Sequence, residues 1–132
     1  MATILVLEDN VLTLGVVGTI LRRAGHEVLR AADEAAALRQ LKRYEGSISL
    51  LIADATMAGR TGQRMIHSLR DGRPGMKVLF MSGYAKEDLV AREILVPDDE
   101  FLEKPFTVQL LSQVVERILT QAHSAGGSFA EA

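Results

Sequence analysis

The sequence has no cysteine and no tryptophan among its 132 residues. The lack of cysteine excludes disulfide bonds and thiolate metal sites, and it fits a reducing cytoplasm. No apolar run approaches the roughly 20 residues of a membrane-spanning helix, and acidic residues follow the start too closely for a signal peptide. The net charge of −2 and the pI near 5.9 give no reason to expect nucleic-acid binding by the chain as a whole. We therefore expect one cytoplasmic domain without membrane contact.

Five short apolar stretches alternate with amphipathic ones along the chain. Strands are predicted at residues 3–7, 27–31, 50–54, 77–81 and 100–102, and helices at 11–24, 34–44, 63–70, 86–94 and 108–118. This alternation predicts a parallel sheet with right-handed crossovers and helices on both faces. The expected fold is α/β and flavodoxin-like, a three-layer (βα)5 sandwich with strand order 2-1-3-4-5. Residues 1–122 form the predicted domain, and residues 123–132, rich in Ala, Gly and Ser, are expected to be a flexible tail.

The first predicted helix has apolar residues at a four-residue spacing, which indicates one buried face. That face comprises Leu12, Val16, Ile20 and Ala24, with Val17 and Leu21 beside them. Gly15 and Gly18 interrupt this helix, and each costs about 1 kcal/mol relative to alanine. Two interpretations stay open: the glycines are small residues tolerated at the surface, or they form, with Leu14, a close-contact patch that docks a partner.

Polar side chains follow four of the five predicted strands. Glu8 and Asp9 come after the first strand, Asp54 ends the third, Ser82 follows the fourth, and Lys104 lies just past the fifth. Taken singly, each of them could cap a helix, belong to a turn or be solvated. Because the carboxyl ends of parallel strands share one edge of the sheet, we expect these residues to lie together there.

The expected cluster has a definite chemistry. Neighbouring carboxylates repel one another and raise each other's pKa unless a cation joins them. The ligands on offer are oxygens and the three histidines fall elsewhere in the pattern, so the fitting cation is Mg²⁺, with Mn²⁺ as a second choice. Lys104 offers a point charge and Ser82 a hydroxyl donor to a phosphate oxygen. A carboxylate such as Asp54 can act as a nucleophile and form an acyl phosphate.

These residues, in this order, resemble the receiver domain of two-component response regulators over about residues 1–122. The segments that carry the resemblance are Leu7-Glu8-Asp9, Asp54-Ala55-Thr56-Met57-Ala58-Gly59 with Gly62, Met81-Ser82-Gly83-Tyr84 and Phe101-Leu102-Glu103-Lys104-Pro105-Phe106. The resemblance implies a CheY-like phosphoprotein of a phosphorelay. Its phosphoacceptor would be Asp54, and its donor a histidine kinase or a histidine phosphotransfer protein.

The resemblance also implies a ligand set for the metal. Mg²⁺ would be held by Asp9, Asp54 and the backbone carbonyl of Thr56, with Glu8 assisting. Glu8 stands where the family usually has aspartate, so it keeps the charge but reaches further. Thr56 and Tyr84 occupy variable positions that influence, in this family, how fast the phosphate is lost.

A conformational switch is implied as well. Ser82 and Lys104 would bind the phosphoryl group, and the Lys104–Pro105 peptide bond is often cis in this family. Ser82 would move toward the phosphate, and Phe101 would turn inward to fill the space it leaves. This movement changes the surface of the fourth helix, fifth strand and fifth helix for a downstream protein target, with a monomer or a phosphorylation-dependent dimer as the expected state.

Two origins of the chain stay open. It is either a stand-alone regulator that acts by protein contact or relays phosphate, or a receiver module excised from a hybrid sensor histidine kinase. The segment Met81-Ser82-Gly83-Tyr84 resembles the receivers of such kinases.

Other functional classes fit the sequence less well. A magnesium-dependent phosphohydrolase commonly has a second aspartate two residues after the nucleophile, where this chain has Thr56. We therefore expect no turnover of external substrates, only self-catalysed phosphoryl transfer and autodephosphorylation. A binding module that has lost phosphorylation is disfavoured by the retained Asp54, Ser82 and Lys104, and nucleotide binding by the lack of a glycine-rich phosphate loop.

Overall fold

The computed structural model describes residues 1–57 and 62–121. Its strands are β1 (Thr3–Leu7), β2 (Glu27–Ala31), β3 (Leu50–Asp54), β4 (Lys77–Ser82) and β5 (Glu100–Glu103), and its helices are α1 (Val11–Arg23), α2 (Glu34–Arg43), α3 (Gly62–Arg70), α4 (Lys86–Ala91) and α5 (Val108–Thr120). The predicted tail at 123–132 and the Ala58-Gly59 part of the loop after Asp54 lie outside the described residues.

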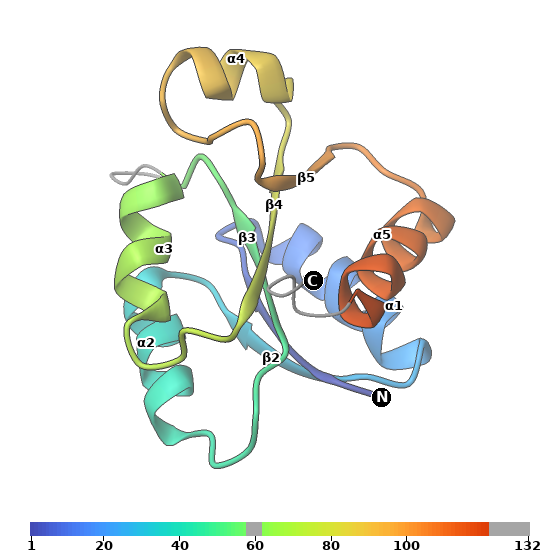
Figure 1. The fold of residues 1–132 in the computed structure, drawn as a ribbon. Helices are drawn as coiled ribbons and strands as arrows, with labels where there is room; N and C mark the ends of the chain where they lie inside the picture. The colour runs from blue at the N-terminus through green and yellow to red at the C-terminus, as the bar shows by residue number, and fades with distance from the viewer. Residues whose placement is uncertain (58–61, 122–132) are drawn as a thin grey trace.

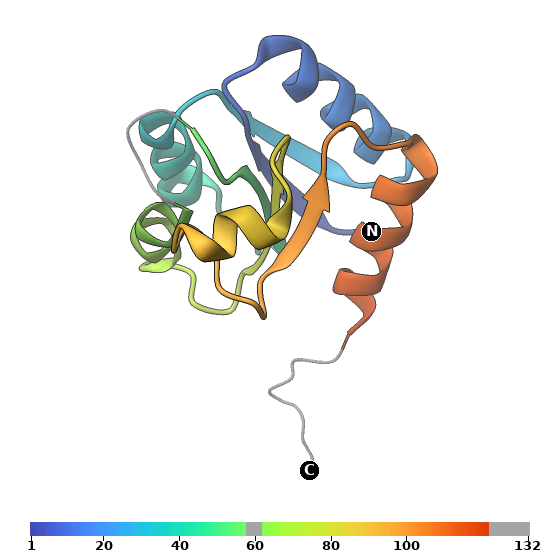
Figure 2. The same ribbon diagram turned by 90° about the horizontal axis from the view of Figure 1, so that it is seen from above.

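The five strands form one parallel sheet in the order β2-β1-β3-β4-β5, so the predicted fold class and strand order are confirmed. Helices α1 and α5 cover one face of the sheet, and α2 and α3 cover the other (Figures 1 and 2). None of the helices in the described ranges is long and apolar enough to cross a bilayer.

The central strand β3 is buried along its whole length. Its side chains alternate between two cores: Leu51 and Ala53 face α2 and α3, whereas Leu50 and Ile52 face α1 and α5. This is why the strand consists of apolar residues without polar alternation, as strands covered on both faces do. Burial of each such leucine or isoleucine contributes about 1.5–3 kcal/mol, and the strand then delivers Asp54 to the edge of the sheet.

Side chains at the helix starts fix where the strands give way to helices. Asn10 Oδ1 accepts a hydrogen bond of 3.0 Å from the N–H of Thr13, which begins α1 directly after Glu8 and Asp9. Asp33 and Thr107 cap α2 and α5 in the same way, since each side chain accepts a hydrogen bond from a backbone N–H three residues later. Such caps satisfy N–H groups that lack a partner within the helix.

The buried face predicted for α1 is partly wrong, since Val17 and Leu21 are buried as predicted but Leu12 and Val16 are not. Leu12 and Val16 are 80% and 56% exposed, and the buried residues are Val17, Gly18 and Leu21. Apolar residues occupy most of the circumference of this helix, so their spacing does not identify the stripe that meets the sheet. Contact with β2, the next element along the chain, and with α5, which lies far away in sequence, buries Val17 and Leu21 instead.

Neither interpretation of Gly18 holds. Gly18 is buried, and a Cβ atom there would lie 3.0 Å from Nε of Arg30 on β2. Gly15, in contrast, has nothing within 4 Å of such an atom. Gly18 is therefore occupied by a contact within the chain, whereas Gly15 fits the interpretation as a tolerated small residue.

Helix α4 is shorter than predicted, since it ends at Ala91 rather than at Ile94. Glu93 has a φ of 62°, and the N–H groups of Ile94 and Leu95 both bond to the carbonyl of Leu89. This turn directs Leu95 into the core, where it is 2% exposed. Burial of that leucine overrides the helical pattern of the local sequence.

The two glycines of α1 provide a matched test of the Arg30 contact. Gly15→Ala is expected to raise the free energy of unfolding by about 1 kcal/mol, because alanine is the better helix former. Gly18→Ala is expected to gain less, because Arg30 has to shift. Urea denaturation of both variants measures the difference, and an equal gain at both positions would show that Arg30 does not constrain Gly18.

Candidate active site at the carboxyl edge of the sheet

The strand pairing brings the predicted site residues to one edge of the sheet. Leu7 pairs with Ala53, Asp54 with Met81, and Ser82 with Glu103. The residues that end or follow these strands therefore converge, and they include all five residues expected at this edge: Glu8, Asp9, Asp54, Ser82 and Lys104. Their roles in the chemistry remain predictions.

Asp54 is 8% exposed and its carboxylate is held by donors on both oxygens. Oδ1 accepts hydrogen bonds from the backbone N–H of Thr56 at 2.9 Å and from the Thr56 hydroxyl at 3.0 Å. Oδ2 accepts one from Lys104 Nζ at 3.0 Å. Because these contacts orient the carboxylate, the remaining lone pairs of its oxygens face a defined direction.

Lys104 lies between two carboxylates. Its Nζ is 2.6 Å from Oε1 of Glu8 and 3.0 Å from Oδ2 of Asp54. Burial lowers the pKa of Lys104, but its hydrogen bonds to Glu8 and Asp54 and their negative charges outweigh that effect, so the pKa lies above its ordinary value. The side chain therefore carries a full positive charge at neutral pH.

Glu8 is fully buried, which is rare for a carboxylate. Burial raises its pKa, and the hydrogen bonds from Lys104 and from the N–H of Asn10 partly offset that rise. Oε2 accepts the Asn10 bond at 3.0 Å. Asn10 is thus a site residue that the sequence reasoning missed, although an asparagine directly before a helical pattern was a recognisable capping signal.

Ser82 is also fully buried. Its Oγ accepts a hydrogen bond of 3.1 Å from the N–H of Tyr84 and lies 3.4 Å from Oγ1 of Thr56. Because the Thr56 hydroxyl donates to Asp54, the Ser82 hydroxyl is the donor to Thr56. Ser82 thus reaches Asp54 through Thr56 in this structure.

The donor set fits a hard divalent cation. Oxygens of Glu8, Asp9 and Asp54 lie within 4.8 Å of one another, and Asp9 is exposed to solvent. Three carboxylates and the Lys104 ammonium sum to a charge of −2 (−3 + 1), which one divalent ion would neutralise. Magnesium prefers carboxylate oxygens and keeps open positions for phosphate, so the residues present suit Mg²⁺.

The other predicted residues surround this cluster. Phe101 is half-buried on the edge strand β5, opposite Phe80, and packs against the core on the α2–α3 face. Tyr84 is 50% exposed, with the guanidinium of Arg92 5.3 Å from its ring centroid. The Lys104–Pro105 peptide bond is cis, as the resemblance implies.

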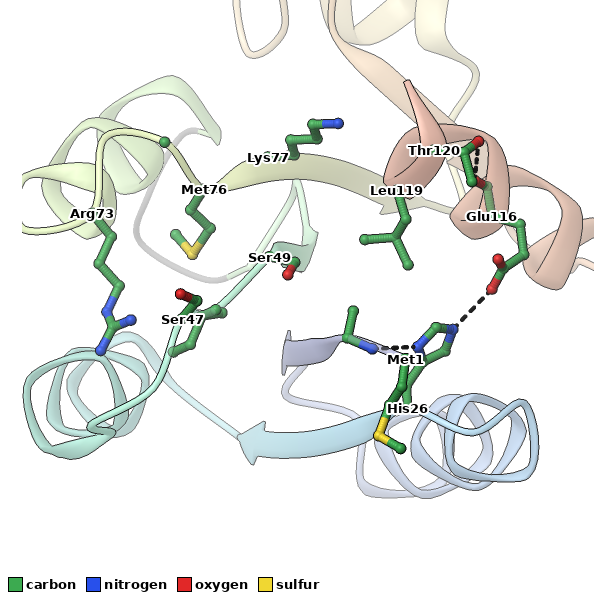
Figure 3. A pocket seen from close by; sticks show the side chains of 13 residues that line it. Met1, His26, Ser47, Ser49, Arg73, Met76, Lys77, Glu116, Leu119 and Thr120 are labelled. Atoms are coloured by element: carbon green, nitrogen blue, oxygen red, sulfur yellow. Dashed lines mark hydrogen bonds and ion pairs between the residues drawn. The ribbon is translucent and has the colours of Figure 1, made fainter. Parts of the chain in front are cut away.

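A cavity of about 620 Å³ lies at the opposite edge of the sheet, away from Asp54 (Figure 3). His26 lines it, donating from Nε2 to Glu116 at 2.9 Å and accepting at Nδ1 from the N–H of Ala2. The charged groups of Arg73 and Lys77 both bind backbone carbonyls, at the ends of α2 and α5. The polar side chains here thus tie elements together and take no part in the Asp54 site.

A family model described as the response regulator receiver domain matches residues 4–116. The sensor kinase CckA of Brucella abortus (strain 2308) is 34% identical over 122 residues, which cover 89% of this chain and 12% of that protein. The aerobic respiration control protein ArcA of Escherichia coli (strain K12) is 25% identical over 123 residues, or 93% of this chain and 50% of that protein. The chain thus spans half or less of these curated relatives.

Solved structures agree with this assignment. The receiver domain of the hybrid histidine kinase CckA has a TM-score of 0.74 and 32% identity, covering 89% of this chain and 99% of that one. A response regulator from Thermotoga maritima has a TM-score of 0.77 and 25% identity, covering 92% of this chain and 99% of that one. Sequence and fold therefore lead to the same family.

Removal of the ammonium tests the electrostatics of the cluster. Lys104→Met leaves Glu8 buried without its counter-charge, so in the presence of a chelator we expect a loss of about 3 kcal/mol in unfolding free energy at pH 7. A group whose pKa is higher in the folded than in the unfolded state contributes most to the free energy of unfolding at a pH below its unfolded-state pKa. This contribution is lost as the pH rises through the folded-state pKa. Glu8 is such a group, so the deficit should shrink as the pH falls from 7 toward 4.

Urea denaturation across this pH range measures the effect. Lys42→Met, at an exposed position of α2, is the matched control and should cost little at any pH. A deficit of Lys104→Met that does not change with pH would contradict the buried ion pair as its cause.

Proposed function

The chain belongs to the response regulator receiver domain family of two-component systems, and we propose that Asp54 is its phosphoacceptor, charged by a phosphohistidine donor. The observation that carries this proposal is the Lys104 ammonium 3.0 Å from the Asp54 carboxylate, at the edge where Glu8 and Asp9 gather. In such a site a phosphoryl group bound to Asp54 would have a cation beside it.

The proposed transfer needs few groups. A carboxylate oxygen of Asp54 attacks the phosphorus of the phosphohistidine, an O–P bond forms, and the P–N bond breaks with its electron pair moving to the imidazole. Mg²⁺, held by Asp9, Asp54 and the Thr56 carbonyl, would neutralise charge on the phosphoryl oxygens. Lys104 would bind one of these oxygens directly. We propose no reaction on external substrates, only gain and loss of this phosphate.

The proposed switch uses the buried hydroxyl of Ser82. In this structure that hydroxyl contacts Thr56, and three phosphoryl oxygens at Asp54 would be stronger acceptors. Its movement toward them would free space that half-buried Phe101 can fill from β5. The surface formed by α4, β5 and α5 would then change for a downstream protein. Thr56 and Tyr84 flank the same space and would modulate the lifetime of the phosphate.

The start of α1 is the proposed docking surface for the phosphodonor. Val11, Leu12 and Val16 are 76%, 80% and 56% exposed, and this helix begins two residues after Asp9. A partner that covers these side chains would stand directly beside the Asp54 site. This assignment replaces the Leu14-Gly15-Gly18 patch, because Gly18 is already covered by Arg30.

A hybrid-kinase module remains the second candidate, supported by the 34% identity to the CckA sensor kinase. The expectation that the chain binds no nucleic acid remains a prediction, since another relative is the DNA-binding transcriptional regulator NtrC of Azospirillum brasilense, 30% identical over 118 residues, or 89% of this chain and 24% of that protein. A stand-alone regulator and a hybrid-kinase module would share the same chemistry at Asp54.

The phosphoacceptor is tested with a small phosphodonor such as acetyl phosphate and Mg²⁺. We expect one acid-labile phosphate per chain, lost in Asp54→Asn because the amide is a poor nucleophile and retained in Asp98→Asn, an exposed control. Intact-protein mass spectrometry counts the phosphates. Labelling that persists in Asp54→Asn would place the acceptor at another residue.

The docking surface is tested by comparing a protein phosphodonor, which has to dock, with acetyl phosphate, which does not. In Leu12→Gln/Val16→Gln the apolar surface is lost, so we expect at least tenfold slower transfer from a phosphohistidine protein and an unchanged rate with acetyl phosphate. Val96→Gln, exposed elsewhere, serves as the control and should leave both rates unchanged. Equal slowing with both donors in the double variant would mean that α1 acts on the site itself and not on docking.

A further inference from the structure

The side chain of Glu8 is committed to two donors of this chain. Its Oε1 lies 2.6 Å from Lys104 Nζ, and its Oε2 accepts a hydrogen bond of 3.0 Å from the N–H of Asn10. With both oxygens engaged and no exposure to solvent, Glu8 is placed to act on Lys104. We propose, building on the function proposed above, that Glu8 is a positioning residue that holds Lys104 against Asp54 before the phosphoryl group arrives.

The length of the glutamate side chain is what makes this contact. An aspartate at this position would place the carboxylate nearer the backbone by one C–C bond, about 1.5 Å. The distance to Lys104 would then grow from 2.6 Å to about 4 Å, beyond a hydrogen bond. The Asn10 N–H holds the second oxygen, so the carboxylate does not swing freely to restore the contact. The choice of glutamate over aspartate therefore determines where the ammonium rests.

Asp9 shows the opposite character. It is exposed, and no hydrogen-bond donor or basic side chain in the described part of the chain contacts its carboxylate. One of its oxygens lies within 4.8 Å of carboxylate oxygens of Glu8 and Asp54. Asp9 is thus free to bind a metal ion, whereas each oxygen of the buried Glu8 already accepts a hydrogen bond from this chain. The two adjacent acidic residues thus have different roles: Asp9 binds the cation, and Glu8 positions Lys104.

A positioned lysine favours phosphoryl binding for a physical reason. A free lysine side chain samples many rotamers and loses that freedom when it binds an anion. In this chain Glu8 has already restricted Lys104, so the incoming phosphoryl group meets an ammonium that is oriented toward Asp54. Preorganised charge of this kind stabilises a phosphoryl group more than charge that must first be ordered.

The experiment separates cation binding from anion binding. The variant is Glu8→Asp, which keeps the charge and shortens the reach. Calorimetry gives the Kd for Mg²⁺ alone, and then the Kd for beryllofluoride, a phosphoryl mimic, at saturating Mg²⁺. We expect the Mg²⁺ Kd to change less than about threefold and the beryllofluoride Kd to rise about tenfold, in line with the loss of a charge-assisted hydrogen bond. Glu103→Asp, the same shortening at an exposed position of β5, should change neither value.

A double-mutant cycle identifies Lys104 as the intermediary. In a Lys104→Met background, Glu8→Asp should have no further effect on the beryllofluoride Kd. A second measurement uses the wild-type protein and so does not depend on the folding of a variant. ¹⁵N NMR of the Lys104 ammonium without Mg²⁺ should show a side chain of restricted motion. A freely reorienting ammonium would overturn the proposal.

The outcomes distinguish this proposal from the proposed function. If the wild-type protein neither binds beryllofluoride nor accepts phosphate, the phosphoacceptor function fails. If the wild type does both, and Glu8→Asp weakens Mg²⁺ and beryllofluoride equally or weakens neither, the function stands and positioning by Glu8 is overturned. An effect of Glu8→Asp that persists without Lys104 would overturn it too.

Discussion

The contact of one ammonium with two carboxylates holds the candidate site together. Lys104 follows β5, Glu8 follows β1 and Asp54 ends β3, so this ion pair network joins the ends of three strands. Without the lysine, the carboxylates would repel one another in a partly buried place where repulsion is weakly screened. Together with the neighbouring Asp9, the cluster of three carboxylates and one ammonium carries a net charge of −2, which suits one divalent cation.

The sheet makes this meeting possible. Parallel pairing in the order β2-β1-β3-β4-β5 places the carboxyl ends of β1, β3, β4 and β5 at the same edge, although these strands lie far apart in the sequence. The apolar strand β3, buried on both faces, fixes the backbone that carries Asp54. Asn10 has two tasks at this edge, since its side chain caps α1 and its N–H binds Glu8. The packed core and the cap of α1 thereby fix the positions of Asp54 and Glu8.

The sequence predicts most of the fold because the relevant signals are local. Apolar runs, helix caps and the polar residues that follow the strands mark the elements and the edge where Asp54 lies. The errors concern features that depend on distant contacts. The buried side of α1 is chosen by the sheet and α5, Gly18 is covered by Arg30 from β2, and α4 ends early because Leu95 enters the core. In the site, the sequence marks Glu8 as acidic but not its pairing with Lys104, which lies 96 residues away.

The central claim is that the residues around Asp54 form a receptacle for a phosphoryl group beside a divalent cation. A crystal structure of the protein with Mg²⁺ and beryllofluoride tests it most directly. We expect beryllium bonded to an oxygen of Asp54, with a fluorine in contact with Lys104 Nζ and the metal bound by Asp9. Beryllofluoride and metal at another location, or Lys104 turned away from a ligand bound to Asp54, would contradict it.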